Sequence, residues 1–317
     1  MARIPAGVAA VRTAVRRALP PSGLLLVACS GGADSLALAS AARFVAPGRV
    51  GLVTVDHGLQ AGSDARALSV AAWAGDAGFD PVEVAAVAVG GRPGGPEAAA
   101  RDARYEALSA VAARVGAVAV LLGHTRDDQA ETVLLALARG AGPRGIAGMP
   151  ARRGIFVRPL LEVSRAETRK ACAAQGLVPW DDPHNVDPAF ARSRVRGAAL
   201  PALVEALGPA VVANLARTAG QVAADNAALD SLARDALLSA YGSDGLEISV
   251  LSGMVSAVRT RVLHAWAREL GASGSALSHR HVEALDALIT DWHGQGPVHL
   301  PGDIRVARVR GRLVRVA

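Results

Sequence analysis

The sequence predicts an α/β protein: a doubly wound parallel sheet in a first domain, then a mostly helical second domain that ends in short strands. Three observations lead to this prediction. Short apolar segments alternate with helical segments through the first half of the chain, which is the pattern of parallel strands joined by helices. Polar or glycine-rich residues follow three of these apolar segments. Beyond them, long stretches rich in Ala and Leu replace the alternation.

The elements of the first domain follow from local periodicity. Helices are expected at 5–19, 35–46, 61–77, 96–115 and 126–139. Strands are expected at 23–29, 50–55, 82–87 and 117–122. Parallel sheets bind ligands at the carboxyl ends of their strands. The loops after the first, second and fourth strands should therefore form one functional rim.

A domain boundary is expected where proline and glycine interrupt the pattern, near residues 200–208. The expected domains are 1–205, which should carry the functional rim, and 206–317. Helices in the second domain are expected at 209–240, 252–270 and 278–291. Strands are expected at 298–300, 304–310 and 313–316.

Composition excludes several classes of protein. The chain has 317 residues, of which 51% are hydrophobic, so we expect a folded two-domain protein rather than a disordered one. No stretch approaches the roughly 20 uninterrupted apolar residues that span a bilayer, so no membrane association is expected. Cys29 and Cys172 stand alone in the sequence, which favours a reducing cytoplasm and two buried thiols.

The net charge of +6 comes almost wholly from arginine, because Lys170 is the single lysine. Arginine binds phosphates through a planar fork and stacks on bases, so this composition favours a nucleic acid partner. A solvated basic surface gives the same composition. The sequence leaves the oligomeric state open, a homodimer included.

A glycine loop follows the first strand and opens a helix, an arrangement that binds phosphates. The loop lacks the lysine of a Walker A motif, and its adjacent glycines do not fit a dinucleotide fingerprint. Asp34 puts a carboxylate beside the expected phosphates, which indicates a bridging Mg²⁺. The expected nucleotide ligands are the loop residues Ser30, Gly31, Gly32, Ala33, Asp34 and Ser35, together with Asp56 and His57 after the second strand.

The segment after the fourth strand carries the most chemistry. Helical spacing places His124, Asp128 and Glu131 on one face. Two acids on one face repel each other unless a cation sits between them, and this cation could be Mg²⁺ or a substrate ammonium. Asp127 is expected to cap the helix instead.

Several ordered motifs resemble those of tRNA(Ile)-lysidine synthetases in the PP-loop ATP pyrophosphatase superfamily. They lie at residues 30–35, 55–59, 100–105, 123–132, 139–149, 158–161 and 181–196. The sequence departs from the family pattern at His184 and Ser193, where the family usually has Ser and Asn. The resemblance implies a Rossmann-like PP-loop sheet and an enzyme that uses ATP, Mg²⁺, free L-lysine and an isoleucine tRNA with a CAU anticodon.

In that family, ATP adenylates the C2 oxygen of the wobble cytidine, and lysine then displaces AMP. The resemblance implies that the glycine loop holds pyrophosphate and that Asp34 positions Mg²⁺. Arg104 would supply a fixed positive charge, although a surface arginine paired with Glu106 or Glu97 is the alternative. Asp128 and Glu131 would bind the lysine ammonium groups, and His124 would accept a proton from the amine or contact the base.

Two pairs of arginines are expected to bind tRNA. Arg192 and Arg196 stand four apart and should share a helical face, suited to phosphate or to the adenylated intermediate. Arg308 and Arg310 should share a strand face by their period of two. An exposed basic stripe and a solvated edge strand are the respective alternatives.

Two other functions fit part of the sequence. A PP-loop enzyme that forms amides or transfers sulfur would share the loop, but isolated cysteines do not favour sulfur transfer. A non-catalytic RNA-binding module would explain the charge but not the acids near His124.

Overall fold

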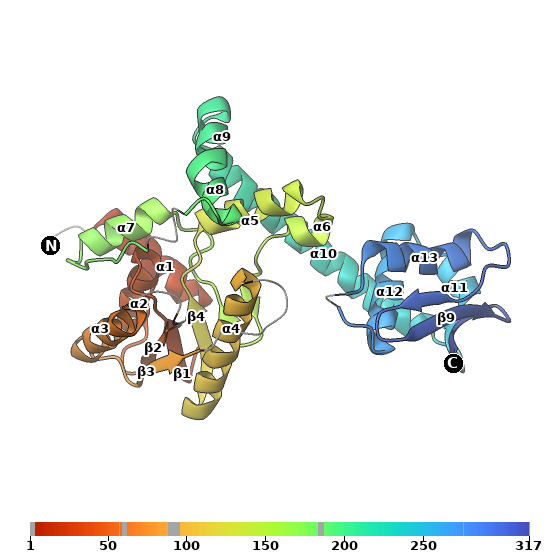
Figure 1. Cartoon of the computed structure of the whole chain (residues 1–317), viewed down its shortest axis with the longest axis horizontal. Coiled ribbons are helices and arrows are strands. Elements are labelled where there is room, and N and C mark those ends of the chain that lie inside the picture. The colour runs from red at the N-terminus through yellow and green to blue at the C-terminus, as the bar shows by residue number, and fades with distance from the viewer. Residues whose placement is uncertain are drawn as a thin grey trace. The chain divides into compact units, whose positions relative to one another are not determined.

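The structure is a computed structural model that describes residues 4–56, 58, 62–87, 96–182, 187–274 and 276–316. The chain divides into two compact units, Met1–Val222 and Ala223–Ala317. Figure 1 labels their elements. The division falls inside helix α10, Val211–Ala240, whereas the proline and glycine signals lie before that helix begins.

The first unit is built on a six-stranded sheet in the order β3-β2-β1-β4-β6-β5. Its strands are β1 (Leu24–Ala28), β2 (Val50–Asp56), β3 (Val82–Ala86), β4 (Ala117–Leu122), β5 (Arg152–Arg153) and β6 (Phe156–Val157). All neighbouring pairs are parallel except β5 and β6, which form an antiparallel edge. The predicted parallel sheet is confirmed. The β5–β6 edge is not predicted, because two-residue strands carry no periodicity.

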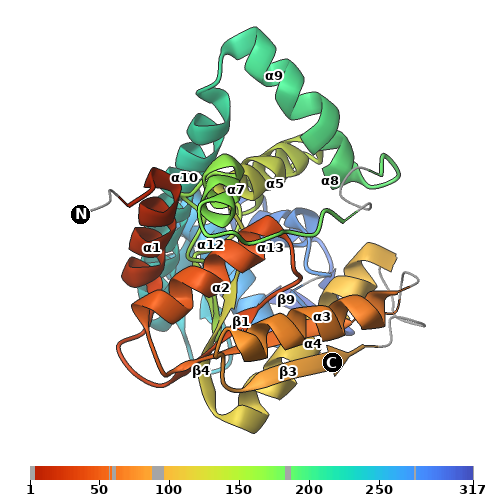
Figure 2. The same cartoon turned by 90° about the vertical axis from the view of Figure 1, so that its left-hand side faces the viewer.

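Helices cover both faces of this sheet, as the alternating burial of β1 requires. Leu25 and Val27 pack in the core formed with α1, α2, α3 and α7, whereas Leu26 and Ala28 pack against α4. The helices are α1 (Ala6–Ala18), α2 (Ala33–Val45), α3 (Ser63–Asp76), α4 (Pro96–Val115) and α7 (Arg165–Ala173). Figure 1 shows α4 across the strands from α3, and Figure 2 views the side that α1, α2 and α3 cover.

The remaining helical elements of the first unit come after β4 in the chain. They are α5 (Arg126–Ala138), α6 (Pro143–Ile146), α8 (Ala191–Arg194), a π-helical turn (Val195–Ala199) and α9 (Leu200–Leu207). Among the described residues, no single helix is long and apolar enough to cross a membrane; the bent pair Ala191–Leu207 and Val211–Ala240 meets the length and composition test only when taken together.

The second unit packs helices against a four-stranded antiparallel sheet of order β7-β10-β9-β8. It contains β7 (Leu246–Glu247), α11 (Ile248–Ser252), α12 (Ser256–Glu269), α13 (His279–Thr290), β8 (Val298–Leu300), β9 (Ile304–Val309) and β10 (Arg312–Val316). Leu263, Leu285 and Leu313 are fully buried in its core. The predicted helical unit ending in short strands is confirmed.

The predicted pairing of Arg308 and Arg310 on one strand face is wrong. Strand β9 ends at Val309, and Arg310 lies in the turn to β10 with a φ of 48°. Gly311 follows with a φ of 81°, and two left-handed residues in succession are typical of a tight hairpin turn. Arg308 instead donates to the Leu288 carbonyl at 3.1 Å.

Leu25→Ala should destabilise the first unit, because Leu25 is fully buried in the central strand. We expect the free energy of unfolding to fall by about 2–5 kcal/mol. Leu68→Ala is the matched control, since Leu68 is 63% exposed on α3 and its loss should change the free energy by less than about 0.5 kcal/mol. Urea unfolding followed by circular dichroism measures both. Equal losses would contradict the assigned core.

Candidate active site

The glycine loop joins β1 to α2 and is held in shape by Ser35. Its hydroxyl donates to the Gly32 carbonyl at 2.9 Å and accepts the Ser30 backbone N–H at 3.2 Å. Gly31 has a φ of 82°, and a Cβ there would lie 3.0 Å from Val70. Only glycine fits this position without strain. The loop therefore leads directly into the N-terminus of α2, and a helix N-terminus attracts anions.

Both cysteines lie against this loop. Cys29 Sγ lies 3.5 Å from Ser35 Oγ, and Cys172 Sγ lies 3.3 Å from the Ala33 carbonyl oxygen. The residues are 2% and 1% exposed and form no disulfide. Burial raises the pKa of Cys29, and it raises the pKa of Cys172 to about 11. The prediction of two buried thiols is confirmed, and neither is primed to react as a thiolate.

Asp34 lies in the first turn of α2 and is held by α7. Thr168 donates a short hydrogen bond to its Oδ1, and Arg165 Nε lies 3.8 Å from its Oδ2. Burial is the main effect that raises the pKa of Asp34 to about 6, and the nearby charge of Asp128 adds to it. The side chain is 25% exposed, so it remains accessible beside the loop.

The end of β4 approaches the loop closely because Gly123 has no side chain. A Cβ on Gly123 would lie 3.2 Å from Ser35 Cα. Helix α5 then begins with a capping box, in which Asp128 Oδ2 accepts the backbone N–H and the hydroxyl of Thr125, each at 2.8 Å. The expectation that Asp127 caps this helix is wrong, because Asp127 instead accepts the backbone N–H of Arg165 at 2.8 Å.

Asp128 and Glu131 meet three arginines in what we term the arginine–carboxylate cluster. The cluster comprises Asp128, Glu131, Arg165, Arg192 and Arg196. Arg165 Nη2 lies 3.0 Å from Asp128 Oδ1 and 3.1 Å from Glu131 Oε1. Arg196 reaches the same two acids at 3.2 and 2.8 Å. Arg192 Nε lies 3.4 Å from Glu131 Oε2. The Glu131 side chain is fully buried.

The sequence predicts a cation between the two acids, either Mg²⁺ or a substrate ammonium. In this structure, guanidinium groups of arginines neutralise the two acids. Burial opposes ionisation of Asp128, but Arg165 and the hydrogen bonds from Thr125 outweigh it and lower the pKa of Asp128. The predicted shared face of Arg192 and Arg196 is confirmed, because both reach Glu131.

A basic pocket of about 220 Å³ lies beside the cluster. It is lined by Ala100, Arg101, Arg104, Tyr105, Leu122, His124 and Arg192. Burial, with the charges of Arg104, Arg158 and Arg192, lowers the pKa of His124 to about 3, so the imidazole is neutral at pH 7. His124 Nδ1 is buried without a hydrogen-bond partner among the described residues. The pocket therefore combines arginines with an unsatisfied neutral ring.

The remaining predicted residues are placed as follows. Asp56 ends β2 and accepts the Gly58 backbone N–H at 2.9 Å. His57, His184 and Asn185 lie outside the described residues. Within the described ranges, no three His, Cys, Asp or Glu residues are grouped to hold a metal ion by themselves.

Sequence reasoning missed Arg165, Thr168 and Arg158. Arg158 is 4% exposed and donates to Tyr105 Oη at 3.0 Å, supporting the basic pocket. Residues 165–170 have helical character in the sequence, and the Ser164–Glu167 capping box marks the start of α7. Its packing beside Asp34 depends on tertiary contacts that no local signal reveals.

The fold and this site define a nucleotide-binding protein of the PP-loop class. A family model described as PP-loop domain matches residues 10–203, and one described as TilS substrate binding domain matches residues 246–314. Among solved structures, a U34-tRNA thiolase, NcsA, from Methanococcus maripaludis aligns with a TM-score of 0.55. It is 16% identical, covers 68% of this chain and 80% of its own, and shows likeness of fold alone.

The chain belongs to the tRNA(Ile)-lysidine synthase family. A protein of that name from Salinispora tropica is 65% identical over 327 residues, which cover 100% of this chain and 98% of the relative. The protein of the same name from Streptomyces coelicolor is 58% identical over 304 residues, with 93% and 86% covered.

Asp34→Asn should change how stability depends on pH. The folded state raises the pKa of Asp34 from 3.8 to about 6, so it binds the proton more tightly than the unfolded state does. The wild type should therefore lose stability as the pH rises from about 4 through 6. Relative to Asp34→Asn, which does not titrate, the loss should reach about 3 kcal/mol. Urea unfolding across this pH range measures it, and parallel profiles would contradict the shift.

Proposed function

We infer that the chain is an ATP-dependent ligase that makes lysidine in tRNA. ATP adenylates the C2 oxygen of the wobble cytidine in an isoleucine tRNA with a CAU anticodon and releases pyrophosphate. An amine of L-lysine then attacks C2 and displaces AMP. The observation that carries this inference is the arginine–carboxylate cluster beside Asp34 of the glycine loop, in a member of the tRNA(Ile)-lysidine synthase family.

The glycine loop would hold the departing pyrophosphate. Its backbone N–H groups and the start of α2 favour negative charge, which develops as the bond to the α-phosphate breaks. Asp34 is the residue suited to Mg²⁺, because this ion is commonly bound by one or two carboxylates together with substrate phosphates. Bound Mg²⁺ would supply charge neutralisation on the phosphates.

The basic pocket would receive the activated cytidine. Arg104 and Arg192 line it and can stabilise the negative charge of the α-phosphate. His124 has the alternative roles of accepting a proton or contacting the base. A pKa of about 3 makes it a weak proton acceptor near pH 7, which supports contact with the base through its unpartnered Nδ1.

Asp128 and Glu131 would bind lysine by exchanging one cation for another. Both acids are occupied by arginines, and the guanidinium of Arg165 bridges them. A lysine ammonium can take the same position, since both groups donate hydrogen bonds to carboxylate oxygens. Lysine binding would then release Arg165 toward the incoming phosphates, whose charge it can pair.

Arg192 and Arg196, with Arg308 and Arg310 in the second unit, are proposed tRNA contacts. The domain division at residues 205 and 206, with a tRNA-binding second part, belongs to this proposal. A cytoplasmic location also belongs to it, and the free, buried cysteines are compatible with a reducing compartment.

Incubation with ATP, labelled lysine and purified tRNAs tests the proposed function. We expect label to enter only the isoleucine tRNA with a CAU anticodon, with AMP and pyrophosphate released. ATP consumption with label absent from every tRNA would point to an amide-forming or sulfur-transfer enzyme. RNA binding without ATP consumption would identify a binding module.

Asp128→Asn should abolish lysine incorporation while ATP still binds. The substitution removes the charge that attracts an ammonium but keeps an oxygen for the capping box. We expect kcat/KM for lysine to fall by roughly 100-fold or more. Asp127→Asn is the matched control, since an amide oxygen can still accept the Arg165 backbone N–H. Unchanged lysine dependence in Asp128→Asn would remove this residue from the lysine site.

Arg165→Gln should lower KM for lysine several-fold, because the cation that competes for Asp128 and Glu131 is gone. Arg169→Gln on the same helix is the control, since Arg169 is 58% exposed and pairs with exposed Asp181. Steady-state kinetics with lysine as the varied substrate measures the effect. An unchanged or higher KM in Arg165→Gln would contradict the exchange.

A further inference from the structure

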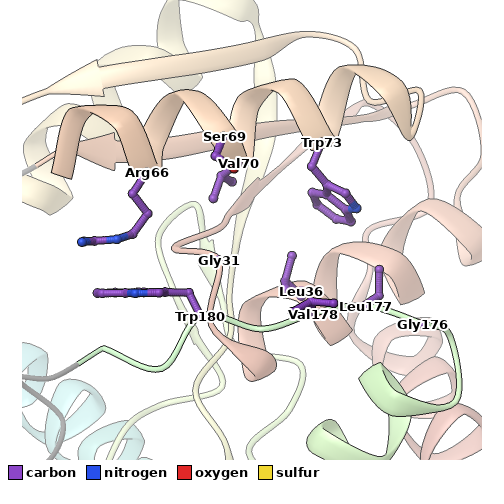
Figure 3. Close-up of a pocket in the computed structure, with 10 residues that line it drawn as sticks. All are labelled: Gly31, Leu36, Arg66, Ser69, Val70, Trp73, Gly176, Leu177, Val178 and Trp180. Carbon is purple, nitrogen blue, oxygen red and sulfur yellow. The ribbon is translucent and has the colours of Figure 1, made fainter. Parts of the chain in front are cut away.

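A second pocket, of about 560 Å³, lies beside Gly31 of the glycine loop. Its walls are α3, the start of α2 and the segment 176–180 (Figure 3). We term it the tryptophan pocket. Its lining is largely apolar and consists of Gly31, Leu36, Arg66, Ser69, Val70, Trp73, Gly176, Leu177, Val178 and Trp180.

The tryptophan pocket is separate from the active site described above. Gly31 is the only residue of the glycine loop that lines it, and neither Asp56 nor any member of the arginine–carboxylate cluster does so. The basic pocket shares no lining residue with it. A ligand in the tryptophan pocket would therefore occupy space that the proposed chemistry does not use.

The lining of the pocket includes a stacked pair of planar groups. The guanidinium of Arg66 lies 3.4 Å from the centroid of the Trp180 ring, and Figure 3 shows the two planes face to face, with Trp73 at the other end of the pocket. Among the described residues, Arg66 has this cation–π contact and no ion pair. A planar cation on an indole marks a surface on which flat rings stack.

The same rim exposes an apolar side chain. Val178 is 90% exposed, two residues before Trp180. Leu36 and Val70 belong to the buried core, but an apolar side chain as exposed as Val178 beside a concave surface favours a binding site. An aromatic platform with an adjoining arginine is the combination by which proteins hold unpaired bases, through stacking and a phosphate contact.

We propose that the tryptophan pocket takes an unpaired nucleobase of the RNA substrate. The base takes the place of the Arg66 guanidinium on the Trp180 indole, and the displaced Arg66 contacts the adjoining phosphate. This inference rests on the proposed function, which supplies RNA as the partner. The positive charge of Arg66 and the net charge of +6 are complementary to RNA.

A ligand in the tryptophan pocket would also affect the shape of the glycine loop. The Trp180 backbone N–H donates to the Gly31 carbonyl at 3.0 Å, so the stacking platform is fastened to the first glycine of the loop. A base held on Trp180 would stabilise this attachment and hence the shape of the loop that receives ATP.

The test is binding of an unmodified transcript of the CAU-anticodon isoleucine tRNA by the full chain at fixed salt. We expect Trp180→Ala to raise the Kd for RNA roughly tenfold, while Trp180→Phe keeps a stacking surface and stays near the wild type. Arg66→Gln should weaken binding and reduce the slope of log Kd against log salt by about one.

Phe44→Ala is the matched control. Arg12 lies 3.4 Å over the Phe44 ring, and Phe44 is 52% exposed, so the variant removes an equivalent cation–π pair outside the pocket. It should leave the Kd for RNA unchanged. Trp180→Phe retains a ring and the backbone bond to Gly31, which guards against a result caused by misfolding.

ATP binding, measured on the same variants, shows whether the base in the tryptophan pocket comes from RNA or from ATP. A loss of ATP affinity equal to or greater than the loss of RNA affinity in Trp180→Ala would assign the pocket to ATP and overturn the proposal. Unchanged RNA binding would overturn it as well. Wild-type lysine incorporation with unaltered RNA binding in Trp180→Ala refutes this inference alone, whereas absent incorporation by the wild type refutes the proposed function.

Discussion

The arrangement of helices around the active site depends on one buried charge, the carboxylate of Glu131. A carboxylate at this depth is stable only when cations accompany it, and Arg165 and Arg196 provide them. These residues come from α5, α7 and the π-helical turn after α8. Ion pairs to one carboxylate thus hold together three segments that are distant in sequence.

The same requirement connects structure with chemistry. Arg165 touches both acids and also lies 3.8 Å from Asp34, so a change in any of these charges is felt by the others. Beside them, the basic pocket presents arginines and a neutral imidazole to incoming anions. In the site without substrates, the arginines are therefore balanced by Asp128 and Glu131. Substrate phosphates can take the place of these acids beside the arginines, and the ammonium of lysine can take the place of an arginine beside the acids.

Much of the fold could be predicted because its signals are local. The expected bounds of α4 and β4 agree with the structure, since long helices and buried strands carry clear periodicity. Arg165 could not be assigned to the site, because it reaches the acids only after α7 packs at the rim. The sequence also could not show that Asp128 rather than Asp127 caps α5, because adjacent carboxylates are equivalent until the turn that precedes the helix is built. The shape of the β9–β10 turn likewise decided the position of Arg310.

The two thiols under the glycine loop have a consequence of a different kind. Cys29 and Cys172 lie against Ser35 and Ala33 and are almost completely shielded from solvent. An alkylating reagent can reach them only when the loop separates from the layer beneath it. The rate of thiol alkylation therefore reports how often the loop opens. Any anion that holds the loop closed should lower this rate without touching either sulfur.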